Sequence, residues 1–247
     1  MKPIYEPKGK AKEYADWALN IYTGCPHGCT YCFAPNVLKR VREDFHSRVE
    51  PRKNIVEETR KQLEQEKITG RTIELCFSCD PYPTGYDTTP TREIIKLLKD
   101  HGNHVQILTK GDGRRDFDLL DKEDLYGITY AGYPGLKNWL NTPVAEPGSS
   151  TPLNRLACLE EAHRLGIKTW ISFEPILDAV DVLDMLNRMP VYVDHVKIGK
   201  LNYHPSDIDW AKFGHEVEAL CKDLGLEYYI KESLRAEMEK SNPAQEQ

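Results

Sequence analysis

The chain has no apolar run long enough to form a transmembrane helix. Its first residues, Met1 to Glu6, contain no apolar signal region. The 33 Lys and Arg residues do not balance the 39 Asp and Glu residues, and the formal net charge is −6. This charge excludes a generally basic nucleic-acid-binding protein but leaves room for a local basic groove. We expect a protein of the reducing cytoplasm that does not bind a membrane.

The seven cysteines lack the pattern of a disulfide framework or of a common zinc site. Their number is odd and the chain has 247 residues, both of which disfavour a disulfide framework. No second C-x2-C or H-x3-H lies at zinc-finger spacing, and His27 is too close to Cys25 and Cys29 to be an easy fourth ligand. Zinc and disulfides therefore remain the weaker alternatives.

Three of the cysteines instead follow the pattern C-x3-C-x2-C, at Cys25, Cys29 and Cys32. The glycines and the proline around them permit a tight loop that points all three sulfurs inward. Three thiolates are one short of a closed structural metal site. An iron–sulfur cube bound in this way keeps one iron without a protein ligand, open to a small molecule.

The rest of the chain alternates predicted strands and helices about six times, as in α/β proteins with right-handed crossovers. We expect a single-domain partial (β/α)6 TIM-like barrel at residues 17–236, after a polar N-terminal extension at 1–16 and before a frayed tail at 237–247. Residues 226–230 offer an extra C-terminal strand. The predicted strands are 17–22, 72–77, 104–109, 126–131, 168–173 and 193–198. The predicted helices are 54–66, 91–101, 116–124, 151–165, 182–189 and 209–224.

Polar side chains follow these strands, where the chemistry of a barrel gathers. Beside the cysteine loop they are Asp80, Lys110, Glu174, Lys200, Asn202 and Lys231. The long Gly- and Pro-rich connection at residues 132–150 is typical of a functional loop. The charged region 36–53 favours a solvated helix and loop, although a phosphate contact through Arg40 is an alternative.

Five motifs together resemble the spore photoproduct lyase-like branch of the radical S-adenosylmethionine (radical SAM) superfamily. They are Gly-Cys-Pro-His-Gly-Cys-Thr-Tyr-Cys-Phe-Ala, Phe-Ser-Cys-Asp-Pro-Tyr, Thr91-Arg92, Ile-Leu-Thr-Lys with Arg115-Asp116, and Glu146-Pro147-Gly148. The similarity covers roughly residues 17–175. The later Trp-Ile-Ser-Phe-Glu-Pro-Ile resembles uncharacterised phage-type relatives of that branch.

The resemblance implies a [4Fe-4S] cluster on the three cysteines, with SAM chelated at the free iron. One electron, from a donor such as flavodoxin or ferredoxin, would then yield a 5′-deoxyadenosyl radical that abstracts hydrogen from a substrate. Tyr31 would lie beside the adenine, and Lys110 would contact the carboxylate of SAM. Ser78 and Asp80 would bind the methionyl amine or the ribose, and Thr129 and Ala131 are weaker ribose candidates. Asp80 precedes a proline and could equally cap a turn, so both interpretations stay open.

In that branch, a cysteine before the corresponding Ser-Asp returns hydrogen to the product radical. Here the register differs, because Phe77 and Ser78 separate Cys76 from Cys79. Strand alternation puts these two cysteines on opposite faces unless the chain turns first. We predict that Cys79, at the strand end, faces the site, although a small buried cysteine explains it equally well.

Glu174 is the second predicted catalytic residue, because a carboxylate at a strand end next to Pro175 is hard to explain as packing. A buried carboxylate also needs a partner. Lys197, Lys200 or Lys231 could supply it. We predict that Glu174 lines the substrate cavity, and that Arg40, Lys200, Asn202 and Lys231 contact the substrate.

Three functions compete on this sequence. The first is a radical enzyme that acts on a nucleobase, in nucleic acid or as a nucleotide. The second is a radical enzyme that acts on a small molecule or peptide, which the short chain favours. The third is a non-catalytic metal–sulfur module that binds nucleic acid or a partner. Lys110, Asp80 and Glu174 argue against the third, because a structural cluster would not need them. We expect the enzyme to act as a monomer.

Overall fold

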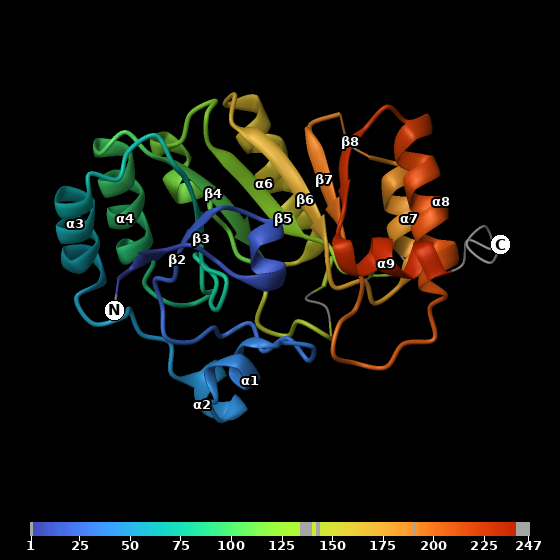
Figure 1. The fold of residues 1–247 in the computed structure, drawn as a ribbon, viewed down its shortest axis with the longest axis horizontal. Helices are drawn as coiled ribbons and strands as arrows, with labels where there is room; N and C mark the ends of the chain where they lie inside the picture. The colour runs from blue at the N-terminus through green and yellow to red at the C-terminus, as the bar shows by residue number, and fades with distance from the viewer. Residues whose placement is uncertain (1, 134–139, 142–143, 190, 241–247) are drawn as a thin grey trace.

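The structure is a computed structural model that describes residues 2–133, 140–141, 144–189 and 191–240. Its centre is one sheet in which eight strands neighbour each other in chain order (Figure 1). The first pair is antiparallel and every later pair is parallel. The strands are β1 (Ile4–Tyr5), β2 (Trp17–Leu19), β3 (Thr72–Leu75), β4 (His104–Thr109), β5 (Leu125–Thr129), β6 (Lys168–Phe173), β7 (His195–Ile198) and β8 (Glu227–Ile230). This architecture confirms the predicted α/β partial barrel and its extra C-terminal strand.

Helices cover the sheet, and two short ones lie beyond its end. Figure 1 shows α3 and α4 at one side, α6 behind the middle strands, and α7 and α8 at the other side, with α1 and α2 below. None of the described helices is both long and apolar enough to cross a membrane. The helices are α1 (Ala34–Leu38), α2 (Arg42–Ser47), α3 (Ile55–Glu66), α4 (Thr89–Asp100), α6 (Pro152–Arg164), α7 (Ala179–Asn187), α8 (Trp210–Asp223) and α9 (Glu232–Lys240), with 3-10 helices η1 (Gly9–Glu13) and η2 (Arg114–Leu119).

Local sequence explains where two of these helices begin. Thr151 caps α6 by accepting a hydrogen bond from the backbone N–H of Asn154 at 3.2 Å, and the helix predicted at 151–165 begins there. The helix predicted at 91–101 begins earlier, at Thr89, because Pro90 fits its first turn. Thr91 instead lies inside the helix and donates to the Pro81 carbonyl at 2.6 Å.

The register of the strands gives the barrel an apolar outer layer and a lumen that holds polar as well as aromatic side chains. Neighbouring residues across a parallel sheet point to the same face, so the alternation of side chains continues from strand to strand. Ile73 pairs with Val105, and both are fully buried in the main hydrophobic core. The next residues along these strands, Glu74 and Gln106, pair with each other and face the lumen. The lumen therefore begins as a polar space that is closed to solvent.

The N-terminal residues are more closely packed than an extension would be. Ile4 is 1% exposed, and its backbone N–H and carbonyl both bond the side chain of Gln62. Tyr14 follows η1, and its carbonyl accepts from Gln106 at 2.9 Å and from Lys197 at 3.0 Å. Residues 4–14 therefore close one side of the barrel, which the polar composition of the segment does not reveal.

Two other predicted segments are partly described. The tail predicted from residue 237 begins within α9, which continues to Lys240, whereas residues 241–247 lie outside the described residues. In the long connection 132–150, residues 134–139 and 142–143 lie outside them too. The described stretch from Ala145 to Ser150 packs against the cysteine loop, because Thr30 N–H donates to the Ala145 carbonyl at 2.9 Å.

Candidate active site

The cysteine loop lies after β2, at the carboxyl end of the sheet. Cys29 is 7% exposed, Cys25 and Cys32 are partly buried, and all three are free thiols. Gly24 permits a close approach here, because a Cβ at that position would lie 2.3 Å from the Phe45 carbonyl oxygen. Burial raises the pKa of Cys29 to about 11, so its thiol stays protonated until a metal ion displaces the proton.

A compact group of potential metal ligands lies near the start of β4, away from the cysteine loop. Among the described residues, the one trio of potential ligands whose atoms all lie within 4.8 Å is His104, Asp121 and Asp124. This trio already contacts an ammonium group, since Lys99 Nζ lies 2.6 Å from Asp121 and 2.5 Å from Asp124.

The loop after β3 carries Ser78 beside the end of β2. Its backbone N–H donates to Asn20 Oδ1 at 2.8 Å, and Asn20 donates to the Tyr5 hydroxyl at 2.7 Å. The Oγ of Ser78 is buried, and no hydrogen-bond partner for it is found among the described residues. A buried hydroxyl without a partner is costly. It is therefore well suited to a ligand that supplies the missing hydrogen bond.

Asp80 is surrounded by partners from the protein itself. Oδ1 accepts from Thr109 Oγ1 at 2.5 Å and from the Tyr82 N–H at 2.9 Å, and Oδ2 accepts from the Lys110 N–H at 2.9 Å. His27 Nδ1 lies 3.4 Å from Oδ2. Burial alone would raise the pKa of Asp80, but His27 and these hydrogen bonds lower it to about 2. The bond from Tyr82 is the turn cap that the sequence offered as one alternative.

The chain turns at Cys76, immediately after the strand. Leu75 is the last residue of β3, and Cys76 has a φ of 73°, in the left-handed region. Strand alternation therefore no longer separates Cys76 from Cys79. Cys76 is 6% exposed, and burial, together with a hydrogen bond to Cys79, raises the pKa of its thiol. Cys79 is partly exposed, with Sγ 4.0 Å from Asn20 Oδ1.

Lys110, Tyr31 and Thr129 meet between the cysteine loop and β5. Lys110 Nζ donates to Thr129 Oγ1 at 3.3 Å and lies 5.7 Å from the centre of the Tyr31 ring. Burial acts to lower the pKa of Lys110, but Cys29 and Glu146 outweigh it and raise the pKa above its usual value. Lys110 therefore stays positively charged, and its charge favours an anionic ligand group at this site. Ala131, two residues beyond Thr129, is fully buried.

A buried ion pair next to this group is the main feature that sequence reasoning missed. Glu146 and Arg155 are both 0% exposed and are joined at 2.6 Å. Glu146 also accepts hydrogen bonds from the hydroxyls of Tyr31 and of Tyr133, the latter at 2.7 Å. Arg155 and Lys110 hold the pKa of Glu146 below its usual value, although burial alone would raise it. The motif Glu146-Pro147-Gly148 was the signal, but the sequence did not indicate a partner.

Glu174 lies at the end of β6 within a second group, called here the Glu174 cluster: Glu174, Tyr14, Asn202 and Lys231. The Tyr14 hydroxyl donates to Glu174 Oε2 at 2.7 Å, Asn202 Nδ2 donates to Oε1 at 3.1 Å, and Lys231 Nζ also donates to Oε2. Lys231 is thus the partner among the three lysines considered. Gly199 allows this packing, because a Cβ there would lie 2.8 Å from Glu174 Cδ.

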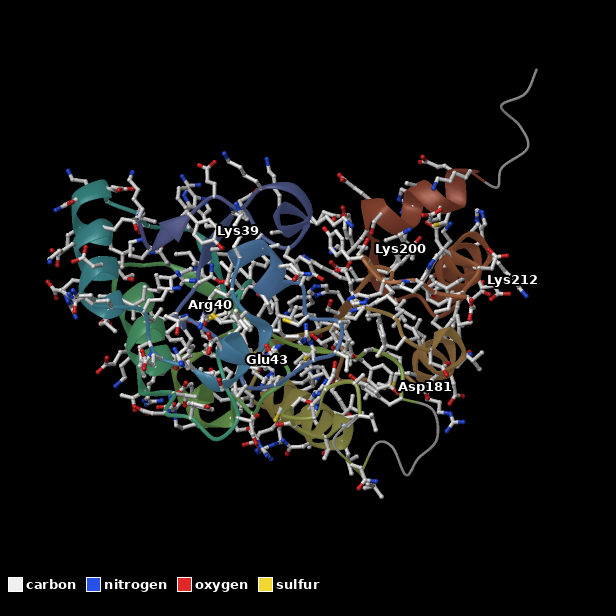
Figure 2. The ribbon with its side chains drawn as sticks, turned by 90° about the horizontal axis from the view of Figure 1, so that it is seen from below. Lys39, Arg40, Glu43, Asp181, Lys200 and Lys212 are labelled. Carbon is white, nitrogen blue, oxygen red and sulfur yellow. The ribbon has the colours of Figure 1, made fainter. Side chains whose placement is uncertain are left out.

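Two predicted substrate contacts are directed elsewhere. Figure 2 labels Arg40 on the α1–α2 segment and Lys200 at the other side of the same face. The Arg40 guanidinium donates to the carbonyls of Thr23 and Asp44. Lys200 pairs with Glu237 of α9 rather than with Glu174. Both side chains are half-buried and already have partners in the protein, so they are less available for a substrate contact than a solvent-exposed side chain would be.

The two site groups are connected through neighbouring strands. Thr129 of β5 pairs in register with Ser172 of β6, so both point to the lumen. Ser172 Oγ lies 3.1 Å from the Tyr14 hydroxyl, which belongs to the Glu174 cluster. The route from Lys110 to Glu174 is therefore a continuous series of polar side chains at one end of the barrel.

Comparison with known sequences assigns the family. The sequence model of the radical SAM superfamily matches residues 19–187. The chain belongs to the radical SAM superfamily. An uncharacterised protein of Methanocaldococcus jannaschii is 30% identical over 224 residues, with 88% of this chain and 80% of that protein covered. An uncharacterised protein of Acidianus two-tailed virus is 28% identical over 184 residues, with 69% and 60% covered. The chain thus spans less than two thirds of the viral relative.

Solved structures show the same radical SAM fold. Spore photoproduct lyase complexed with dinucleoside spore photoproduct matches with a TM-score of 0.66 at 12% identity, covering 92% of this chain and 79% of the lyase. SuiB of Streptococcus suis bound to S-adenosylmethionine matches with a TM-score of 0.62 at 12% identity, covering 86% of this chain and 50% of SuiB. Identities this low establish the fold alone. The match to the family model over residues 19–187, which this fold accompanies, confirms the predicted superfamily and enzyme class.

The residues present fit the cofactors that the family implies. Three free thiols at one loop are a suitable donor set for a [4Fe-4S] cluster with one open iron. The unpartnered Ser78 Oγ and the cationic Lys110 are suitable contacts for the amine and carboxylate of SAM. Tyr31 donates its hydroxyl hydrogen bond to Glu146, and its ring lies beside Lys110, which is a suitable place for an aromatic contact with the adenine.

Proposed function

We propose that this radical SAM enzyme removes a hydrogen atom from a nucleobase, in nucleic acid or in a nucleotide. Cys25, Cys29 and Cys32 would hold the cluster, and the bound cofactors would supply reductive cleavage of SAM and hydrogen abstraction. Lys110 would bind the SAM carboxylate, and Ser78 would bind its amine or ribose.

The Glu174 cluster supports a nucleobase as the substrate. In it the Asn202 amide donates to the Glu174 carboxylate at 3.1 Å, and a base that replaced this hydrogen bond would meet one donor and one acceptor at the carboxyl end of the sheet. This pair complements the amide and amino edges of a base. The nearby Tyr14 keeps its hydroxyl proton, since burial and Glu174 raise its pKa well above the usual value. Lys231 neutralises Glu174 in the absence of substrate.

Cys79 is our candidate for hydrogen return to the substrate. It is the partly exposed thiol of the β3 loop, and Cys76 is the buried one. In this step the S–H bond breaks, a C–H bond forms on the substrate radical, and the sulfur retains the unpaired electron. The Cys79→Ser variant, compared with Cys158→Ser in the α6 core, should form 5′-deoxyadenosine but lose the hydrogenated product.

A peptide is the second candidate substrate, because SuiB bound to its precursor peptide SuiA also matches this fold, with a TM-score of 0.65. Dinucleotides, short single-stranded oligonucleotides and peptides should be compared in one anaerobic assay with reduced protein and SAM. Our proposal predicts that nucleotide substrates raise 5′-deoxyadenosine formation above the substrate-free rate and that peptides do not. The opposite result would favour the peptide enzyme.

A further inference from the structure

Helix α2 contacts the carbonyl oxygens of all three ligand cysteines. The Arg42 guanidinium donates to the Cys29 carbonyl through one terminal nitrogen and to the Cys32 carbonyl at 3.3 Å through the other. His46 Nδ1 lies 2.8 Å from the Cys25 carbonyl oxygen. Residues 42 and 46 are four apart, so they share one face of the helix. One face of one short helix therefore fixes the cysteine loop from behind.

The backbone of α2 takes part in the same contact. The Cys25 N–H donates to the Phe45 carbonyl at 3.1 Å, next to the close approach that Gly24 allows. Arg42 is half-buried, so its hydrogen bonds are better shielded from water than those of a solvated arginine. A planar guanidinium with two parallel donors is the side chain best suited to bridge two carbonyls.

The other arginines of this segment serve different groups. Arg40 donates to the carbonyls of Thr23 and Asp44. Arg48, at the end of α2, has a 74% exposed side chain that pairs with Asp44. Among these three arginines, Arg42 alone contacts the ligand cysteines. Arg48 therefore offers a control with the same charge on the same helix.

We propose that Arg42 is a positioning residue that sets both the retention and the reduction potential of the iron–sulfur cluster. This inference rests on the proposed cluster at the three cysteines. By anchoring two of their carbonyls, Arg42 restricts the backbone of Cys29 and Cys32, and with it the directions of their sulfurs. Its charge also lies beside a group that becomes more negative on reduction, so it favours the reduced state.

The test compares reconstituted wild-type protein with Arg42→Gln, Arg42→Lys and Arg48→Gln. Midpoint potentials come from an anaerobic titration followed by paramagnetic resonance, and the rate of iron loss is measured with a chelator in excess. Arg42→Gln should lower the equilibrium constant for one-electron reduction at least tenfold, a shift of about 59 mV to lower potential. It should also lose iron at least tenfold faster.

The conservative variant separates charge from geometry. Arg42→Lys should keep the wild-type potential, because the charge remains, but should lose iron faster, because one ammonium cannot bridge both carbonyls in the same way. Arg48→Gln should match wild type in both measurements. If Arg42→Gln does not fold, the inference is judged on the rate of iron loss from Arg42→Lys.

Three outcomes would overturn the inference: wild-type potential and iron loss in Arg42→Gln, wild-type iron loss in Arg42→Lys, or equal effects in Arg48→Gln and Arg42→Gln. The proposed function would fail separately, in the wild-type protein. That failure would be a wild type that binds no iron–sulfur cluster, or one whose cluster does not respond to SAM.

Discussion

Replacing Arg155 with methionine would leave the carboxylate of Glu146 buried without its guanidinium partner. The pair is joined at 2.6 Å with both side chains fully buried. Arg155 also donates to the Thr129 and Ser150 carbonyls, each at 3.0 Å. Methionine fills much of the same volume but donates no hydrogen bond. The substitution therefore isolates the loss of charge and of donors from the loss of packing.

The expected cost follows from the burial of the pair. Breaking a fully buried ion pair by removing one partner costs about 3–5 kcal/mol, because the remaining charge is left desolvated. For a domain of this size, that loss corresponds to a fall in melting temperature of about 6–20 °C. The double variant Arg155→Met with Glu146→Gln should recover at least about 1 kcal/mol, since the buried carboxylate is then gone.

The assay is urea unfolding of the metal-free chain, followed by far-ultraviolet circular dichroism under reducing conditions. Arg188→Met is the matched control, since Arg188 pairs with Asp184 at 3.0 Å with 71% and 46% of the side chains exposed. Its loss should be about 0.3–0.5 kcal/mol. A loss for Arg155→Met no larger than that of Arg188→Met would refute the reasoning.

Two further predictions concern ionisable groups of the lumen and the site. Burial raises the pKa of Glu74 to about 8, from 4.5 in the unfolded chain, so between these values the folded state holds a proton that the unfolded state has released. The free energy of unfolding of the wild type should therefore fall as pH rises through that window, by up to about 1.4 kcal/mol per pH unit in urea unfolding. Glu74→Gln should not show this fall. Equal pH slopes of the unfolding free energy in the two proteins would contradict the prediction. Lys110→Met should retain the cluster but weaken SAM binding at least about tenfold in anaerobic calorimetry, since a charged hydrogen bond is worth about 1.5–3 kcal/mol, and an unchanged dissociation constant would exclude the assigned contact.

Sequence reasoning could propose the cofactor end of the site because two simple rules apply there. The spacing of Cys25, Cys29 and Cys32 is itself enough to propose the ligand set, because the three residues lie in one short loop. The strand-end rule then selects Lys110 and Glu174, because the carboxyl ends of parallel strands share one edge. Both residues lie at that edge in the structure, in two groups joined through β5 and β6.

What the sequence could not predict depends on long-range contacts or unusual backbone. The partner of Glu146 is Arg155, which occupies a helix position that an exposed arginine could also take. Tyr14 reaches the lumen from a segment whose lysines and glycine resemble a solvated tail. The turn at Cys76 uses a positive φ, which a non-glycine residue seldom adopts and no sequence pattern signals.

The most direct test of the central claim is spectroscopic and requires no oxygen. The chain is reconstituted with iron and sulfide and reduced, and its paramagnetic resonance spectrum is recorded before and after SAM is added. We expect a cluster signal that shifts with SAM, release of 5′-deoxyadenosine, and the loss of both in Cys29→Ala. A colourless protein that binds zinc and forms no nucleoside would contradict the account.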